Sequence, residues 1–152
     1  MRQSAVSRQT SPGSQHRDSA APPPAKAAGF REAVVVEDDA DIGKLLKFIL
    51  EREGFGVTLC SDGRAGAARL ASPDVPSLVI LDVMLPYMNG YELLAIVRKS
   101  PAWQKVPVLM LTSKSREGDI VRALDAGAND YVTKPFQPAE LRARVRRLVA
   151  SP

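Results

Sequence analysis

The chain has 152 residues, which is room for one domain of ordinary size, and its 45% hydrophobic and 25% charged residues are typical of a soluble globular protein. No apolar run approaches the roughly 20 residues that cross a bilayer, so no membrane partner is expected. The net charge is +4, but residues 1–30 hold four basic side chains and one acidic one, so the rest is nearly neutral and direct nucleic-acid binding is not indicated.

Residues 1–30 are predicted to be a disordered N-terminal extension. They are rich in Ser, Gln, Ala and Pro and contain one large aliphatic residue, Val6, so they cannot bury enough apolar surface to offset the entropy of ordering. They also lack the apolar core of a secretory signal. The single cysteine, Cys60, cannot form an intrachain disulfide, and we therefore expect a cytoplasmic protein.

Residues 31–150 are predicted to form one α/β domain in which strands and helices alternate. Short apolar runs predict five strands, at 33–36, 57–60, 78–81, 108–111 and 130–133. Apolar residues at helical spacing predict helices between and after them, with apolar faces at 42–50, 93–97, 120–124 and 141–149 and a weaker period at 62–71. Gly54 is expected to end the helix at 42–50, and Gly127 the helix at 120–124.

The alternation predicts a parallel sheet that is covered by helices on both faces. The first, third and fourth strands are apolar throughout, as central strands should be, whereas the other two mix polar and apolar residues and suit the sheet edges. The expected fold is a doubly wound, flavodoxin-like three-layer sandwich with strand order 2-1-3-4-5. Its binding site should lie at the carboxyl ends of the strands, beside the switch point between the first and third strands.

Polar residues follow four of these strands, and a parallel sheet would bring them to one edge. Glu37 and Asp38 follow the first strand, and Asp82, Thr112 and Lys134 follow the third, fourth and fifth. Each alone has an ordinary explanation as a turn or cap residue. Together, three close carboxylates repel one another and need a cation, and their hard oxygen atoms suit Mg²⁺. Asp82 stands alone on the central strand and is the predicted nucleophile toward a phosphoryl donor.

The ordered set of motifs resembles the receiver domain of bacterial response regulators over residues 32–150. The resemblance rests on Val-Val-Glu-Asp-Asp at 35–39, the segment 82–90 with its Pro86 and Gly90, Leu-Thr-Ser at 111–113, and the segment 127–136 with its Lys-Pro pair. The pattern is chemotaxis-regulator-like and closest to the class that carries winged-helix DNA-binding domains. It implies a receiver domain at 31–150 that takes a phosphoryl group from a sensor histidine kinase or phosphotransfer protein and acts as a switch rather than as an enzyme.

The resemblance also implies a role for each site residue. For the cofactor, Mg²⁺, it implies the ligands Glu37, Asp38, Asp82 and the backbone carbonyl of Met84. Asp82 would be the phosphoacceptor, and Lys134 and Thr112 would contact the phosphoryl oxygens. Thr112 and Tyr131 would form the switch, with Tyr131 moving inward as the Thr112 hydroxyl is drawn to the phosphate. The bond between Lys134 and Pro135 would be cis.

The last two helices and the fifth strand are the expected output face. The resemblance implies a possible homodimer in which Asp130 pairs with Arg144, and Asp125 with Arg146, across a two-fold axis. The basic residues of the last helix are more simply explained by the preference of cations for a helix C-terminus than by nucleic-acid binding.

Three functions stay open at this point. The chain is a stand-alone receiver or phosphorelay intermediate that controls a downstream effector protein, the N-terminal receiver of a longer regulator with a C-terminal effector domain, or an enzyme on the same fold. The enzyme would be a Mg²⁺-dependent phosphatase or a flavin-binding protein. Against it, Met84 stands where a second acidic residue would follow the nucleophile, and there is no phosphate-binding Gly-rich loop.

Overall fold

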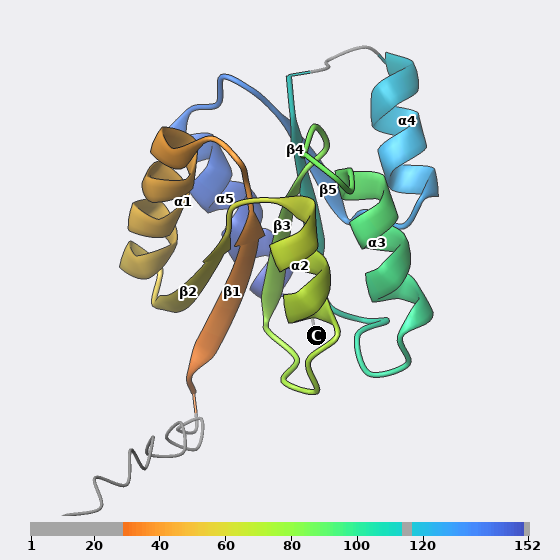
Figure 1. The fold of residues 1–152 in the computed structure, drawn as a ribbon. Coiled ribbons are helices and arrows are strands. Elements are labelled where there is room, and N and C mark those ends of the chain that lie inside the picture. The colour runs from red at the N-terminus through yellow and green to blue at the C-terminus, as the bar shows by residue number, and fades with distance from the viewer. Residues whose placement is uncertain (1–28, 114–116, 151–152) are drawn as a thin grey trace, which may run out of the picture.

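The computed structural model describes residues 29–113 and 117–150, so the predicted extension at 1–30 lies almost entirely outside the described residues. Strands and helices alternate along the domain (Figure 1), as β1 (Arg31–Val36), α1 (Ala40–Arg52), β2 (Phe55–Cys60), α2 (Gly63–Leu70), β3 (Leu78–Asp82), α3 (Gly90–Lys99), β4 (Val108–Thr112), α4 (Glu117–Asp125), β5 (Asp130–Thr133) and α5 (Pro138–Ala150). Within these ranges no helix is long and apolar enough to cross a membrane.

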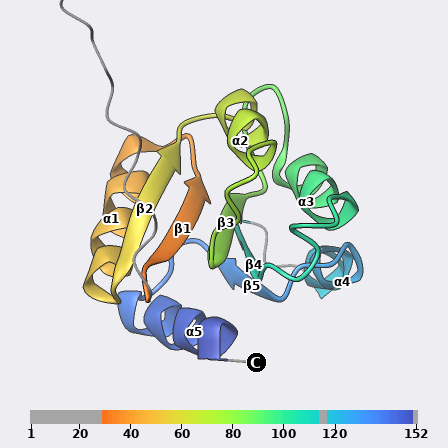
Figure 2. The ribbon, with the colours of Figure 1, turned by 90° about the horizontal axis from the view of Figure 1, so that it is seen from below.

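The five strands form one parallel sheet in the order β2-β1-β3-β4-β5, which confirms the predicted order. Helices α1 and α5 cover one face of the sheet, and α2, α3 and α4 cover the other (Figure 2). The doubly wound, three-layer arrangement is therefore the one that the sequence predicts. Its switch point lies between β1 and β3, which both end at the same edge.

The central strands are buried because both of their faces are covered. Along β1, Val34 and Val36 pack into the core beneath α2, α3 and α4, whereas Ala33 and Val35 pack into the core beneath α1 and α5. All five residues of β3 and all five of β4 are buried in the same way. Continuous apolar runs are the sequence signature of such strands.

Strands β1 and β2 each begin two residues earlier than predicted. The register continues through Arg31↔Phe55 and Glu32↔Gly56, although neither Arg31 nor Glu32 belongs to an apolar run. Arg31 stacks on the Phe55 ring at 4.6 Å, and the carboxylate of Glu32 accepts a hydrogen bond from the Thr58 hydroxyl at 3.1 Å. Side-chain partners on the neighbouring strand therefore support the longer pairing.

Helix α2, for which the apolar period was weakest, forms against the sheet because its residues are small. A Cβ atom on Gly66 would lie 3.0 Å from the side chain of Val36 on β1, so the helix backbone approaches the sheet closely. The side chain of Asp62 caps the helix by accepting a hydrogen bond from the Ala65 N–H at 2.8 Å. Close packing and the cap replace the missing apolar stripe.

Replacement of Gly90 with Ala is expected to lower the free energy of unfolding by about 2–3 kcal/mol. Gly90 begins α3, and a Cβ atom there would lie 2.3 Å from the backbone oxygen of Asp82, so α3 or the end of β3 must move. Urea denaturation measures the loss. The control is Gly118→Ala in α4, where a Cβ atom meets nothing within 4 Å and helix propensity predicts a gain of up to about 1 kcal/mol. Equal effects of the two substitutions would contradict the steric explanation.

Candidate functional site

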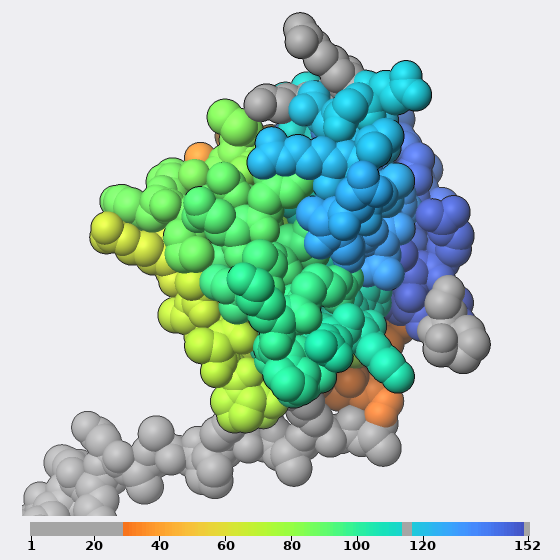
Figure 3. All heavy atoms as spheres, turned by 90° about the vertical axis from the view of Figure 1, so that its right-hand side faces the viewer, coloured from red at the N-terminus to blue at the C-terminus, as the bar shows by residue number. Residues whose placement is uncertain are grey.

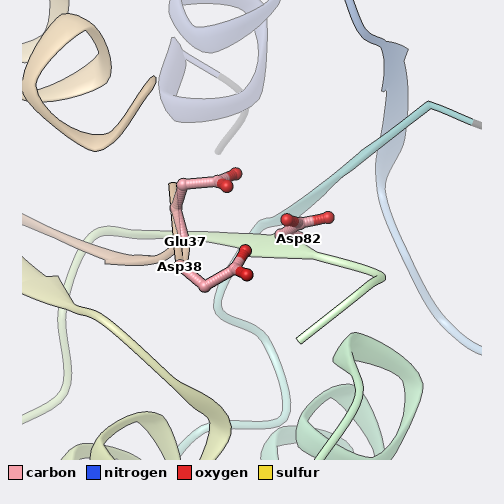
Figure 4. Close-up of side chains that lie close together, drawn as sticks. All are labelled: Glu37, Asp38 and Asp82. Carbon is pink, nitrogen blue, oxygen red and sulfur yellow. The ribbon is translucent and has the colours of Figure 1, made fainter. Parts of the chain in front are cut away.

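Three carboxylates gather at the carboxyl ends of β1 and β3 (Figure 4). Glu37 and Asp38 follow β1, and Asp82 is the last residue of β3. One oxygen from each of the three lies within 4.8 Å of the others. Glu37 and Asp82 are only 4% and 3% exposed, whereas Asp38 is exposed. The structure therefore brings together the acidic residues that the sequence singles out.

Lys134 reaches this cluster from the end of β5 and neutralises part of its charge. Its Nζ donates to Glu37 Oε2 at 2.8 Å and to Asp82 Oδ2 at 3.0 Å. Burial alone would lower the pKa of Lys134, but the hydrogen bonds to these two carboxylates outweigh it and leave the pKa raised, so the ammonium stays charged. The peptide bond between Lys134 and Pro135 is cis, as the resemblance implies.

One ammonium does not balance three carboxylates. Burial raises the pKa of Glu37 to about 7; the hydrogen bond from Lys134 opposes the rise and the charge of Asp82 adds to it. A proton and a metal ion would therefore compete for Glu37. In this pocket a second positive charge would favour the ionised carboxylate.

The donor set fits a small, hard divalent cation. Ligands at about 2.1 Å from Mg²⁺ lie about 3–4 Å apart, so the 4.8 Å cluster needs only a slight contraction. The Met84 N–H donates to Asp82 Oδ1 at 3.1 Å, which places the backbone of the β3–α3 loop beside the same carboxylate. The Asp38 carboxylate has no hydrogen-bond partner within the described ranges and is available as a ligand.

Thr112 and Tyr131 lie next to one another on the neighbouring strands. Thr112 ends β4, one residue after Leu111, which pairs with Asp82 in the sheet. The Thr112 carbonyl accepts a hydrogen bond from the Lys134 N–H at 2.7 Å. Burial raises the pKa of the Tyr131 hydroxyl, and a hydrogen bond with the Thr112 side chain opposes the rise. Tyr131 is only 7% exposed, so the structure has its side chain inward. The predicted inward movement stays a prediction.

Three of the four residues of the predicted homodimer have partners within the chain. Arg144 donates to Asp130 Oδ1 at 2.9 Å, and Arg146 forms two hydrogen bonds with Glu53 at 2.8 and 2.9 Å. Asp125, at the end of α4, is exposed. A dimer that uses these pairs would have to exchange internal contacts for external ones, and it stays a prediction.

Sequence reasoning missed a contact beside this site, between Arg64 at the start of α2 and Tyr87 in the β3–α3 loop. The Arg64 guanidinium carbon lies 3.8 Å from the centre of the Tyr87 ring. Tyr87 also has a positive φ of 70°. No local pattern links these residues, because their approach depends on how α2 packs against the loop.

Known proteins resemble the chain over this same domain. A family model described as the response regulator receiver domain matches residues 33–146. The alkaline phosphatase synthesis transcriptional regulatory protein PhoP of Bacillus subtilis is 43% identical over 121 residues, which cover 78% of this chain and 48% of that protein. The DNA-binding response regulator MtrA of Mycobacterium leprae is 44% identical over 115 residues, which cover 74% and 48%. The chain thus spans about half the length of these curated relatives.

Solved structures agree with the sequence matches. The receiver domain of the sensor histidine kinase PA1611 from Pseudomonas aeruginosa superposes with a TM-score of 0.73 at 30% identity, covering 80% of this chain and 99% of that one. That structure has a magnesium ion coordinated in its active-site cleft. The chain belongs to the family of response regulator receiver domains, the phosphoacceptor domains of two-component signalling systems.

Proposed function

We propose that Asp82 accepts a phosphoryl group from a sensor histidine kinase or a phosphotransfer protein, in a reaction that needs Mg²⁺. The observation that carries the proposal is the cluster of Glu37, Asp38 and Asp82 within 4.8 Å, with the Lys134 ammonium on two of its members. With three anionic groups and one cation, the site has too little positive charge to be neutral. A divalent cation supplies it.

The proposed Mg²⁺ ligands are Glu37, Asp38, Asp82 and the backbone carbonyl of Met84. When bound, the ion neutralises charge on the carboxylates and on the phosphoryl oxygens, which is the usual need of phosphoryl transfer. Two observations support Mg²⁺ binding at this site: its donor set, and the magnesium ion in the active-site cleft of the related receiver domain from Pseudomonas aeruginosa.

In the proposed transfer, a carboxylate oxygen of Asp82 attacks the phosphorus of a phosphohistidine. A new O–P bond forms as the N–P bond breaks, and the imidazole nitrogen leaves with the electron pair. Lys134, which already contacts Asp82 at 3.0 Å, would follow the charge onto a phosphoryl oxygen. The Thr112 hydroxyl would donate a hydrogen bond to a second phosphoryl oxygen. The chain's own part is positioning and charge compensation.

The proposed switch runs from Thr112 to Tyr131. A phosphoryl oxygen would compete with Tyr131 for the Thr112 side chain, and this changes the packing of β5 against α4. Moving an equilibrium from 1:99 to 99:1 takes about 5.5 kcal/mol. Hydrogen bonds to charged groups give about 1.5–3 kcal/mol each, so Thr112 and Lys134 together reach ~3–6 kcal/mol. We expect a graded shift in population that partner binding completes.

The proposed output surface is formed by α4, β5 and α5. Figure 3 looks onto α4, where Val121 and Leu124 are exposed, with α5 at its edge. The partner would be an effector, either a further domain of the same polypeptide or a separate protein, and the related transcriptional regulators support the first form. A cytoplasmic location and a receiver at 31–150 preceded by an extension at 1–30 belong to the proposal. So does a homodimer that uses Asp125, Asp130, Arg144 and Arg146.

Incubation with acetyl phosphate and Mg²⁺ tests the function. The expected result is one acid-stable, hydroxylamine-labile phosphoryl group per chain, detected as one added phosphate by intact-mass spectrometry. No phosphate should be added when EDTA removes the metal before the incubation. Because Asp82 is the one acceptor, the bound phosphoryl group stays at or below one per chain, even where the aspartyl phosphate hydrolyses and forms again. Release of many equivalents of phosphate from unrelated phosphomonoesters would instead support the phosphatase alternative and contradict the proposal.

A further inference from the structure

Tyr87 has an unusual backbone conformation for its residue type. Among residues 29–113 and 117–150 it is the only one other than glycine with a positive φ, at 70°. The Met88 N–H donates to the Pro86 carbonyl at 2.9 Å and closes a three-residue γ-turn centred on Tyr87. A positive φ is costly for a bulky side chain and persists only where the surroundings hold it.

The first turn of α2 holds this turn in place. The Gly63 N–H donates to the Pro86 carbonyl at 3.2 Å, and a Cβ atom on Gly63 would lie 2.3 Å from the backbone oxygen of Met88. The helix and the loop are therefore in direct backbone contact. In Figure 1, α2 lies beside α3, on the sheet face where the loop enters α3.

The Tyr87 ring is held by Arg64 rather than by the core. Its side chain is 67% exposed, so burial does not fix it. The Arg64 guanidinium carbon lies 3.8 Å from the ring centre, which is the shortest of the cation–ring distances in the described part of the chain. An arginine on an aromatic face is attracted by the ring quadrupole and covers one side of the ring.

The same loop touches the acidic site through the backbone of Met84. The Met84 N–H donates to Asp82 Oδ1 at 3.1 Å, and the Gly90 N–H donates to the Val83 carbonyl at 3.0 Å, which closes the loop at its base. The turn at Tyr87 is thus the fixed point between two anchored ends. Movement of that turn would shift the Met84 carbonyl.

We propose that Arg64 and Tyr87 are positioning residues for the cation site. Their stacking holds the γ-turn so that the Met84 carbonyl and the Asp82 carboxylate face one ion. This rests on the proposed Mg²⁺ site, and it adds α2, which contributes no ligand, to the elements that set the affinity for Mg²⁺.

Calorimetric titration of the metal-free protein with Mg²⁺ tests the pair. Arg64→Ala and Tyr87→Ala are each expected to weaken Mg²⁺ binding roughly two- to fivefold, the range of one exposed cation–ring contact. The double variant should bind no more weakly than the single ones, because either change removes the whole contact. Tyr87→Phe keeps the ring and should bind like the wild type.

Amide hydrogen exchange gives a second readout, without metal. Exchange of the Met88 N–H should be faster in Arg64→Ala than in the wild type. The matched control is Arg52→Ala, which removes a similar exposed contact between Arg52 and Phe48 at 5.2 Å in α1. It should change neither the Mg²⁺ affinity nor this exchange rate.

Two failures can be told apart. Wild-type Mg²⁺ affinity in Arg64→Ala, with or without a loss of stability, would make the pair a surface contact only and overturn the inference. The proposed cation site itself would instead be overturned by a wild-type protein that binds no Mg²⁺. An Asp38→Asn variant that binds Mg²⁺ as tightly as the wild type would also overturn it.

Discussion

Replacement of Asp82 with Asn is expected to abolish phosphorylation by acetyl phosphate, with a fall in rate of at least about 1,000-fold. The amide has no anionic oxygen to attack phosphorus. The other two carboxylates follow β1, whereas Asp82 ends β3 and pairs with Leu111 of β4. Neither of them can therefore take the place of the Asp82 carboxylate. Intact-mass spectrometry of the protein after incubation with acetyl phosphate and Mg²⁺ measures the loss.

Asp39→Asn is the matched control for Asp82→Asn. Asp39 lies next to the cluster and caps α1 by accepting hydrogen bonds from the Asp41 and Ile42 N–H groups at 2.9 and 3.1 Å. Asn is as good a cap as Asp, so this variant removes one nearby negative charge and keeps the fold. It should still take one phosphoryl group. Full phosphorylation of Asp82→Asn would show that another residue, such as Asp38, is the acceptor.

Replacement of Lys134 with Met is expected to change phosphorylation and metal binding in opposite directions. Phosphorylation should slow by about 100- to 1,000-fold, because a preorganised cation at the phosphoryl oxygens is lost. Binding of Mg²⁺ should tighten, because the ammonium at 2.8 Å from Glu37 and 3.0 Å from Asp82 no longer competes for their oxygens. Acetyl phosphate kinetics at saturating Mg²⁺ and calorimetric titration separate the two effects.

Stability gives a third readout for Lys134→Met. Without metal, the variant should lose about 2–3 kcal/mol of unfolding free energy, because two buried carboxylates lose their ion pair. Added Mg²⁺ should restore most of it by binding only the folded protein. The exposed Lys105 provides the control, since it precedes β4 and so lies at the opposite end of the strands from the cluster. Parallel losses of Mg²⁺ binding and phosphorylation would contradict charge compensation by Lys134.

The sequence alone was sufficient for the fold class and for the acidic residues that the structure brings together. Apolar runs of four residues mark β1, β3 and β4 as central, because only a strand that is covered on both faces has no polar side. Parallel strands then place everything that follows them at one edge. Glu37, Asp82 and Lys134 could therefore be brought together without any contact being known.

Tertiary structure alone decided the contacts between side chains of distant segments. Strands β1 and β2 begin early because Arg31 and Glu32 find partners across the sheet, and this pairing has no counterpart in the hydrophobic pattern. Arg146 pairs with Glu53 of its own chain, a residue 93 positions away, where a partner across a dimer axis was expected. Such choices depend on the distances between packed elements.

The same division holds at the site. Residue types and spacing determined which groups form it, since each strand end is fixed by a local pattern. The approach of α2 to the β3–α3 loop and the inward position of Tyr131 follow only from how the layers pack. Periodicity records which face of an element is buried, and packing alone sets which side chains meet there.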